Sequence, residues 1–488
     1  MTTRAVMVLG TTSGAGKSWL ATALCRWYAR QGLKVAPFKA QNMSNNARVV
    51  PCPDGSMGEI GSAQYFQALA AHAAPEVRMN PVLLKPENDT ASQVVLMGRV
   101  RADLAEVPWR ERSERLWPFA RDALDALMAE NDVVVIEGAG SPAEINLHAS
   151  DYVNMRTALH ARAACLLVTD IDRGGAFAHL YGTHQLLAAQ ERALIRGYVL
   201  NRFRGDATLL APGPQQLQQL TGVPTLAVLP MWRGHGLPEE DGVFDESSRG
   251  AQGGLRIAVV AFPQISNLDE FQPLRHCAGV RLSWARSAVD VAGADWIVLP
   301  GSKQTGVDLA WLRAQGLFDA VRDHVARGGR VLGICGGLQM LGRQLLDPHH
   351  IEGHSGGQSD GLSLLPIDTR FEPAKTLRRT RARFGAPQGD WATLAGLAFD
   401  GYEIRCGRTD ADAGAQIVLR NDEGAPIGWQ RGPVLGVYAH GLFESADTMR
   451  ALFGAAGRPL DAVFDGLADF IHARFEPGSL RRLIEANP

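Results

Sequence analysis

The sequence predicts two α/β domains in succession, the first built on a parallel sheet with helices on both faces. In both halves of the chain, short apolar runs alternate with longer stretches of helical periodicity, the pattern typical of such folds. Residues 231–254 interrupt that rhythm with Gly, Pro, Ser and an acidic cluster, and a second alternation starts at Leu255. We therefore predict a first domain at residues 1–230, a linker at 231–254, a second domain at 255–450 and a helical tail at 451–488.

The individual elements follow from these apolar runs and from helical spacing. In the first domain the expected strands are 5–9, 34–37, 132–136, 164–169 and 197–201, and the expected helices include 18–30 and 64–73. In the second domain we expect strands at 256–261, 296–299 and 330–334, and helices at 309–327 and from Gly337 onward. The clearest helix of the tail is 461–474.

Composition indicates an enzyme that acts on small molecules. Of the 488 residues, 49 are Lys or Arg and 51 are Asp or Glu, so the net charge of -2 provides no basic surface for nucleic acid or for a membrane. The six cysteines show no paired spacing, which fits a reducing cytoplasm. The apolar run at 5–9 is too short for a signal peptide or a membrane span.

A phosphate-binding loop follows the first predicted strand and opens the first predicted helix. Its glycines let backbone N–H groups face phosphates, Lys17 would neutralise the terminal phosphates, and Ser18 would place its hydroxyl on Mg²⁺. The residues expected to bind ATP are Thr12, Gly14, Gly16, Lys17 and Ser18.

A carboxylate for the same metal is expected where another buried strand ends. Glu137 directly follows the strand predicted at 132–136, and ligands of open parallel sheets gather at the carboxyl edge of the strands. Glu137 is therefore the first choice, together with Ser18, for holding Mg²⁺. Asp170 and Asp172 are alternatives, which could equally cap a helix or hold the following turn.

Cys335 has the setting of a nucleophile in the second domain. It lies among glycines at a sharp turn from an apolar strand into a helix, and a helix N-terminus favours the reactive thiolate. His440, at the end of another apolar strand, is the best candidate for its base. Backbone N–H groups of Gly336 and of Gly301 or Ser302 are expected to stabilise an oxyanion.

Three segments of the second domain resemble the class I glutamine amidotransferases of the triad type. They are 333–337, 300–302 and 438–441. The resemblance implies that Cys335 attacks the side-chain amide of glutamine with His440 as its base. Members with a full triad carry a carboxylate two residues after the histidine, where this chain has Leu442. The group that orients His440 is therefore open, with Glu444 as one candidate.

Across residues 4–445 the chain resembles the cobyric acid synthase family, the glutamine-hydrolysing amidases of cobalamin biosynthesis. The segments that carry this resemblance are 37–43, 58–64, 79–86, 137–146, 170–175, 201–206, 265–267, 300–303 and 401–404. The phosphate loop has five residues rather than the usual four between Gly10 and Gly16, as in dethiobiotin synthetase. The resemblance implies a dethiobiotin-synthetase-like P-loop domain with a parallel sheet, followed by a class I glutamine amidotransferase-like α/β domain.

The same resemblance implies the reaction. Adenosylcobyrinic acid a,c-diamide would be amidated at its b, d, e and g carboxylates, through an acyl phosphate that reacts with ammonia released from glutamine. Mg²⁺ is the implied cofactor, ATP and L-glutamine are co-substrates, and no prosthetic group is expected. Gln41, Asn42 and Asn146 are candidate contacts to the corrinoid, although a single Asn in such loops could equally cap a helix.

Other functions fit parts of the sequence. The sister enzyme that amidates cobyrinic acid at a and c has the same chemistry, and only substrate trials separate the two. A regulatory P-loop ATPase fits the first domain but leaves Cys335 and His440 without a role, and the intact elbow at Cys335 disfavours an inactive binding scaffold. Ammonia is expected to follow a covered path between the domains, whereas the oligomeric state is not readable from sequence.

Overall fold

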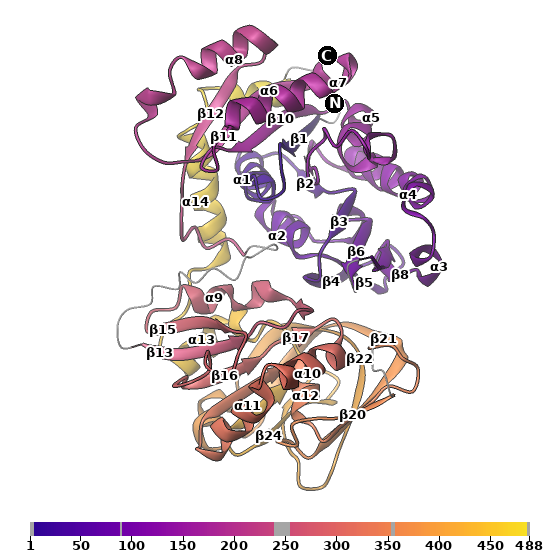
Figure 1. The fold of residues 1–488 in the computed structure, drawn as a ribbon, viewed down its shortest axis with the longest axis vertical. Coiled ribbons are helices and arrows are strands. Elements are labelled where there is room, and N and C mark those ends of the chain that lie inside the picture. Colours follow the sequence, from indigo (N-terminus) through magenta and orange to yellow (C-terminus); the bar gives the residue numbers. More distant parts are fainter. Residues whose placement is uncertain (1–3, 88–89, 239–253, 353–356, 486–488) are drawn as a thin grey trace.

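The computed structural model describes residues 4–87, 90–238, 254–352 and 357–485. Two α/β domains follow one another along the long axis of the molecule, the indigo-to-magenta first domain at one end and the orange second domain at the other (Figure 1). Within these residues, no helix has the length and apolar character needed to cross a membrane.

The first domain is built on a six-stranded sheet in the order β12-β11-β10-β1-β9-β2, with every neighbouring pair parallel. Its strands are β1 (Arg4–Gly10), β2 (Val35–Phe38), β9 (Val133–Glu137), β10 (Ala164–Asp170), β11 (Ile195–Phe203) and β12 (Thr225–Pro230). The five predicted strands are confirmed, with small shifts at their ends. Because all strands run the same way, the loops that follow β1, β9 and β10 meet at one edge of the sheet.

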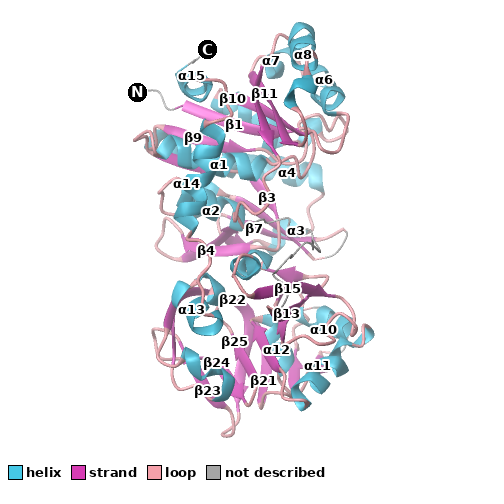
Figure 2. Cartoon of the chain, turned by 90° about the vertical axis from the view of Figure 1, so that its left-hand side faces the viewer, coloured by secondary structure: helices cyan, strands magenta, loops and turns pink. Residues whose placement is uncertain are grey.

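Helices and two small sheets surround this sheet. The helices are α1 (Lys17–Ala29), α2 (Ser62–Ala70), α3 (Ala102–Ala105), α4 (Trp109–Glu130), α5 (Thr157–Ala161), α6 (Ala176–Leu186), α7 (Ala189–Arg192) and α8 (Gly213–Thr221). One small sheet contains β3 (Gln41–Met43), β6 (Val82–Pro86), β7 (Ser92–Leu96) and β8 (Arg99–Val100), and the other pairs β4 (Ala47–Pro51) with β5 (Met57–Gly61). Both small sheets lie on the side of the first domain that faces the second (Figures 1 and 2).

The second domain has a larger mixed sheet. Its parallel part contains β15 (Val280–Ala285), β13 (Leu255–Val260), β16 (Trp296–Leu299), β18 (Arg330–Ile334) and β25 (Val434–Val437), in that order. The sheet continues through β24 (Pro426–Arg431), β23 (Gln416–Arg420), β21 (Ile367–Phe384), β19 (Gln344–Leu346) and β20 (Gln358–Asp360), with β22 (Ala398–Ala411) paired to β21. A separate two-stranded pair joins β14 (Ile265–Ser266) to β17 (Gly301–Ser302). The three predicted strands of this domain are confirmed.

The helices of the second domain include one correction to the sequence prediction. They are α9 (Gln272–Arg275), α10 (Thr305–Ala314), α11 (Leu317–Ala326), α12 (Gly336–Leu341) and α13 (Ala446–Phe453). The single helix predicted at 309–327 is wrong, because α10 and α11 are separate helices. Gly316, between them, adopts φ 69°, a left-handed conformation that ends a helix and that glycine reaches at little cost.

The predicted helical tail returns to the first domain. Helix α14 (Leu460–His472) packs along α1, and its buried face joins the apolar core between α1 and the first sheet. Buried Arg26 of α1 forms ion pairs with Asp461 and Asp465 of α14, at 2.7 and 2.8 Å. The chain thus crosses to the second domain and comes back, so the first domain is completed by the last residues described, including α15 (Ser479–Glu485).

Part of the predicted linker is packed rather than extended. Trp232, just after β12, stacks on Phe470 of α14 with ring centroids 4.7 Å apart. Residues 239–253 of the predicted linker lie outside the described residues.

Candidate active sites in the two domains

The phosphate loop has the backbone expected from its glycines. Gly14 and Gly16 adopt φ 70° and 100°, and a Cβ at Gly16 would lie 2.1 Å from the side-chain nitrogen of Asn201, so glycine is required there by both backbone and space. Lys17 is buried and folds back over the loop, where its Nζ donates to the carbonyl oxygens of Thr12 and Gly140, each at 3.0 Å. The predicted nucleotide-binding residues therefore lie together on one loop at the sheet edge.

Glu137 lies at the same edge, within reach of the loop. Ser18 Oγ donates to Glu137 Oε1 at 2.7 Å, and Lys39 Nζ donates to the same oxygen at 2.8 Å. Gln67 of α2 donates to the other carboxylate oxygen at 2.6 Å. Burial raises the pKa of Glu137, but the Lys39 ammonium and these hydrogen bonds outweigh it and hold the pKa below its usual value. The carboxylate is therefore charged at neutral pH.

This arrangement suits a magnesium ion held with nucleotide. A serine hydroxyl and a charged carboxylate 2.7 Å apart form an all-oxygen pair beside a phosphate loop. Mg²⁺ in such sites takes one or two protein oxygens and completes its octahedron with phosphate oxygens and waters. Ser18 and Glu137 thus fit the metal as predicted.

The alternative carboxylates lie beside the same edge but are engaged by arginines. Asp170 accepts from Arg202 at 3.0 Å and lies 3.3 Å from Arg173, and Asp172 accepts from Arg204 at 2.6 Å. These contacts support the structural interpretation of the pair, in which both carboxylates hold the loops after β10 and β11.

The three residues predicted to contact substrate lie in different surroundings. Gln41 is buried and accepts a hydrogen bond from the Tyr152 hydroxyl at 2.8 Å, and buried Asn42 donates to Gln64 at 3.3 Å. Asn146 is exposed, in the loop that follows β9. Their role in binding substrate stays a prediction.

In the second domain, the turn after β18 has the geometry of a nucleophile elbow. Cys335 adopts φ 50° and ψ -106°, which is strained for a residue with a side chain and is found where a nucleophile is presented between a strand and a helix. The flanking glycines allow close packing, since a Cβ at Gly337 would lie 1.9 Å from the carbonyl oxygen of Leu299. The elbow predicted from the sequence is confirmed.

The loop that carries Gly301 and Ser302 lies against this elbow. A Cβ at Gly336 would come 2.9 Å from the backbone nitrogen of Ser302, and one at Gly301 would come 3.0 Å from Cε1 of His440. The Ser302 hydroxyl donates to buried Asp308 at 2.5 Å, and burial raises the pKa of that carboxyl to about 7. The structure therefore brings together all the residues predicted for the oxyanion site, with the Ser302 side chain fixed by Asp308.

His440 lies between the Cys335 thiol and a buried carboxylate that the sequence analysis missed. Its Nδ1 lies 3.0 Å from Oε1 of Glu270, in the short helical turn η5 (Leu268–Phe271). The Cys335 thiol, which donates to the carbonyl oxygen of Ile404 at 3.6 Å, lies close enough to His440 to raise its pKa. Burial alone would lower the pKa of His440, but the carboxylate of Glu270 and the contact with Cys335 raise it. Both His440 and Glu270 are almost fully buried, at 1% and 0% exposure, so this charge acts with little screening.

Glu444 is not the partner of His440, which corrects the candidate offered by the sequence. Its carboxylate instead forms an ion pair with Arg48 of the first domain at 2.7 Å. Glu270 lies 170 residues before His440, so no motif around the histidine points to it. Lys39 lies in the segment 37–43, which carries the family resemblance, and its place directly after the buried strand β2 is the sequence signal that points to it.

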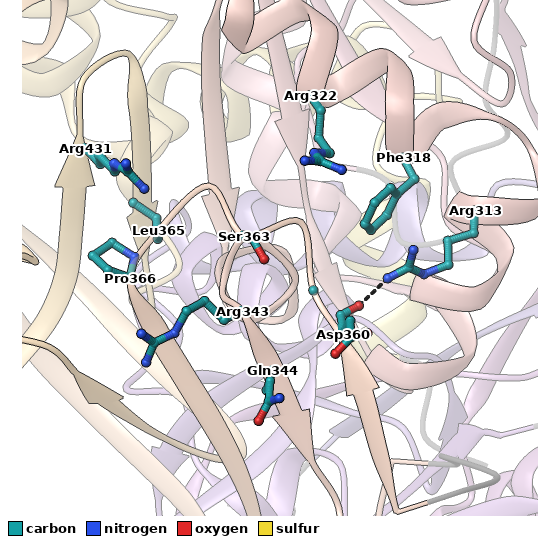
Figure 3. A pocket seen from close by; sticks show the side chains of 11 residues that line it. Arg313, Phe318, Arg322, Arg343, Gln344, Asp360, Ser363, Leu365, Pro366 and Arg431 are labelled. Carbon is teal, nitrogen blue, oxygen red and sulfur yellow. Dashed lines mark hydrogen bonds between the residues drawn. The ribbon is translucent and has the colours of Figure 1, made fainter.

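A cavity of about 610 Å³ opens elsewhere on the second domain (Figure 3). Its lining includes Arg313, Arg322, Arg343 and Arg431, and Arg313 bonds to the carbonyl of Asp360. Arg343 is already paired with the carboxylates of Asp368 and Asp412. None of the predicted site residues lines this cavity.

Comparison with known proteins matches both domains. Residues 6–234 match the CobQ/CobB/MinD/ParA nucleotide binding domain, and residues 256–448 match the CobB/CobQ-like glutamine amidotransferase domain. A solved glutamine amidotransferase aligns with 44% of this chain and all of its own length, at 19% identity and a TM-score of 0.31, so the fold assignment rests on the family models.

These two domains define an enzyme class, the ATP-using, glutamine-dependent ligases that form amides. Curated relatives named cobyric acid synthase match the chain over nearly its whole length: 73% identity in Methylibium petroleiphilum, 69% in Leptothrix cholodnii and 66% in Variovorax paradoxus. In each case at least 97% of the relative and 99% of this chain are covered. The chain belongs to the cobyric acid synthase family.

Proposed function

We propose that this enzyme transfers the amide nitrogen of glutamine to the b, d, e and g carboxylates of adenosylcobyrinic acid a,c-diamide and so produces adenosylcobyric acid. One observation carries the proposal: a single chain holds a Cys335–His440–Glu270 cluster in one domain and a Lys17–Ser18–Glu137 cluster in the other. A nitrogen-releasing site and a carboxylate-activating site are the two parts that such an amidation needs.

At the first of these sites, Cys335 attacks the side-chain amide carbon of glutamine. Backbone N–H groups of Gly336 and of the Gly301–Ser302 loop stabilise the oxyanion, and His440 passes a proton to the departing ammonia. Glu270 fixes the orientation of the imidazole and stabilises its protonated form. Water then hydrolyses the glutamyl thioester and frees the thiol.

At the second site, the phosphate loop holds ATP and a substrate carboxylate attacks the γ-phosphate in line, which forms the acyl phosphate and releases ADP. Lys17 and Lys39 offset the charge of the phosphates, while Gly14 and Gly16 let the backbone approach them. Mg²⁺, held by Ser18 and Glu137, would supply further neutralisation of that charge. Ammonia displaces phosphate from the acyl phosphate and leaves the amide. We propose Gln41, Asn42 and Asn146 as contacts to the corrinoid.

A comparison of nitrogen sources tests the division of labour. Cys335→Ala is expected to lose amidation with glutamine and to keep ATP-dependent amidation with ammonium salt, because only the release of nitrogen requires the thiol. Lys17→Ala is expected to lose amidation from both sources. Amidation by Cys335→Ala with glutamine as the sole nitrogen source would remove Cys335 from the mechanism.

Substrate trials separate the proposal from the sister reaction. The purified enzyme is incubated with ATP and glutamine and either cobyrinic acid or its adenosylated a,c-diamide, and products are resolved by mass. We expect four successive additions of one amide each to the diamide. Amidation of cobyrinic acid at a and c instead would reassign the substrate and leave the two-site chemistry intact.

A further inference from the structure

The turn that carries Glu270 is held from outside its own domain. Just before β4 of the first domain, the Asn46 side chain accepts a hydrogen bond from the backbone N–H of Leu268 at 2.8 Å. The backbone N–H of Ala47 donates to the Asn267 side chain at 2.9 Å. These paired bonds join segments 222 and 220 residues apart and fix the start of the turn 267–270.

Arg48, the next residue of β4, anchors the middle of the same turn. Its side chain is 2% exposed and forms ion pairs with Asp269 and Glu444, both in the second domain. Leaving a buried cation without its ion-pair partner strongly destabilises the folded protein. This guanidinium and the Asp269 carboxylate therefore fix each other in place. The rings of Tyr65, Phe66 and Tyr402 lie 5.0 to 5.4 Å from the guanidinium and enclose it.

The contact with the first domain begins at the first residue of the turn. Asn267 adopts φ 55° and ψ 42°, a left-handed conformation that asparagine tolerates well, and its side chain accepts the hydrogen bond from Ala47. Asp269 and Glu270 are adjacent, so the carboxylate bound by Arg48 is one peptide away from the carboxylate that meets His440.

A second contact joins Arg48 to the histidine. Tyr402, one of the rings around Arg48, stacks on the His440 ring with centroids 5.2 Å apart and planes at 21°. Backbone hydrogen bonds in both directions, at 2.9 and 3.3 Å, fix Tyr402 beside His440. Arg48 therefore contacts Tyr402, which stacks on the imidazole, and Asp269, the neighbour of the glutamate that meets Nδ1.

We propose that Arg48, assisted by Asn46, is a positioning residue of the glutaminase site although it belongs to the ATP-binding domain. It holds the turn 267–270 so that Glu270 stays on Nδ1 of His440. Glutamine hydrolysis then reaches its full rate only when the two domains are docked, which ties the release of ammonia to the presence of the domain that uses it. This inference rests on the proposed roles of Cys335 and His440.

The test measures glutamate release and ammonia-dependent amidation in the full-length enzyme. Arg48→Met is expected to lower kcat for glutamine hydrolysis by about 10- to 100-fold, the range seen when an orienting partner of a functional side chain is lost. KM for glutamine should stay within about twofold, because the expected loss is in the orientation of the imidazole and not in the binding of glutamine. Amidation with ammonium salt should be retained, which shows that the ATP-binding domain is folded.

A double mutant separates positioning from a general packing role. If Arg48 acts through Glu270, the Arg48→Met/Glu270→Gln variant is no slower in glutamine hydrolysis than Glu270→Gln alone, since the two changes remove one interaction. Asn46→Ala, a milder change, should lower kcat in the same direction. Lys375→Met, which removes another buried contact between the domains at Glu59, serves as the control and should keep wild-type glutamine hydrolysis.

Several outcomes would overturn the inference. The inference is wrong if both Arg48→Met and Asn46→Ala keep the wild-type kcat, or if the losses in the double mutant are additive. It is also wrong if Arg48→Met loses glutamine-driven and ammonia-driven amidation equally. If wild-type enzyme releases glutamate but Arg48→Met does so equally well, only this inference fails. If the wild type releases none, the proposed glutaminase site itself fails.

Discussion

At the candidate glutaminase site, the buried carboxylate of Glu270 lies 3.0 Å from Nδ1 of the His440 imidazole. The negative charge of this carboxylate has a measurable effect on how activity depends on pH. The Glu270 carboxylate raises the pKa of His440. The reactive form of a Cys–His pair is a thiolate beside an imidazolium, and that form is lost as pH rises through the pKa of the imidazolium. We therefore expect the alkaline limit of glutaminase activity to depend on Glu270.

Glu270→Gln is expected to move the alkaline limb of kcat/KM for glutamine to lower pH, because the negative charge that stabilises the imidazolium is gone. We also expect kcat to fall by roughly 10²-fold or more, since the corresponding change in serine proteases costs about 10⁴-fold. Initial rates of glutamate release across the pH range check both. An unshifted alkaline limb would show that Glu270 does not act on His440.

The charge on Glu137 predicts the behaviour of the other site. Glu137→Gln is expected to reduce amidation from glutamine and from ammonia by roughly 10²-fold, and to raise the Mg²⁺ concentration needed, because one ligand of the ion loses its charge. Basal glutamine hydrolysis should be unchanged. The control is Glu130→Gln, the same substitution in a half-exposed ion pair with Arg78. Amidation at the wild-type rate and the wild-type Mg²⁺ requirement in Glu137→Gln would argue against the assignment.

At the scale of elements, helix α14 shows how packing overrides position in the sequence. Its buried residues, Val463, Phe464, Leu467, Ala468 and Ile471, belong to the same apolar core as Val6 and Val8 of β1. An amphipathic helix must bury its apolar face somewhere, and here that face completes the first domain. The tail is therefore part of the ATP-binding unit.

Phe464→Ala should lower the free energy of unfolding of the first domain by about 3–5 kcal/mol, the cost of a large cavity in a core. The measurement is denaturant unfolding followed together with loss of ammonia-dependent amidation. Asp469→Asn, in an exposed pair with Arg30 on the same helix, is the control and should change the free energy by less than about 1 kcal/mol. Equal effects of the two substitutions would contradict the role given to α14.

At the scale of the whole molecule, buried charges fill the contact between the domains. Glu59, fully buried in β5, forms ion pairs with Lys85 of its own domain and with Lys375 of β21 in the second domain, the latter at 2.5 Å. Lys303, which follows the oxyanion loop, reaches Glu87 of the first domain at 3.2 Å. The interface thus lies beside the loop of Gly301 and Ser302, where we expect ammonia to be kept from water.

Lys375→Met is expected to lower the ratio of amide formed to glutamate released, because loss of the Lys375–Glu59 pair opens the interface to water at that point. Glutamine hydrolysis should continue, since Arg48 and Asn46 still hold the turn that carries Glu270. The ratio is measured with limiting corrinoid acceptor and excess glutamine. Arg343→Met, in the arginine-lined cavity away from the interface, is the control and should leave the ratio unchanged. An unchanged ratio in Lys375→Met would count against a covered path at this contact.

The sequence by itself determined the features that depend on neighbouring residues. The readable features were five strands of the first sheet, three strands of the second, the phosphate loop with Lys17 and Ser18, the carboxylate of Glu137 and the elbow at Cys335. Each is a local pattern of apolar runs, glycines and one functional residue. Parallel strands also place their ends at one edge, which made the meeting of Ser18 with Glu137 predictable.

Only the tertiary structure decided which distant residues complete these sites. Glu270 lies beside Nδ1 of His440, whereas Leu442 offers no carboxylate, and Arg48 and Asn46 reach the turn of Glu270 from the other domain. The break at Gly316 and the return of α14 to α1 were settled in the same way. A contact between residues far apart in the chain depends on how whole elements pack, and that packing leaves no periodic or local signal at either residue.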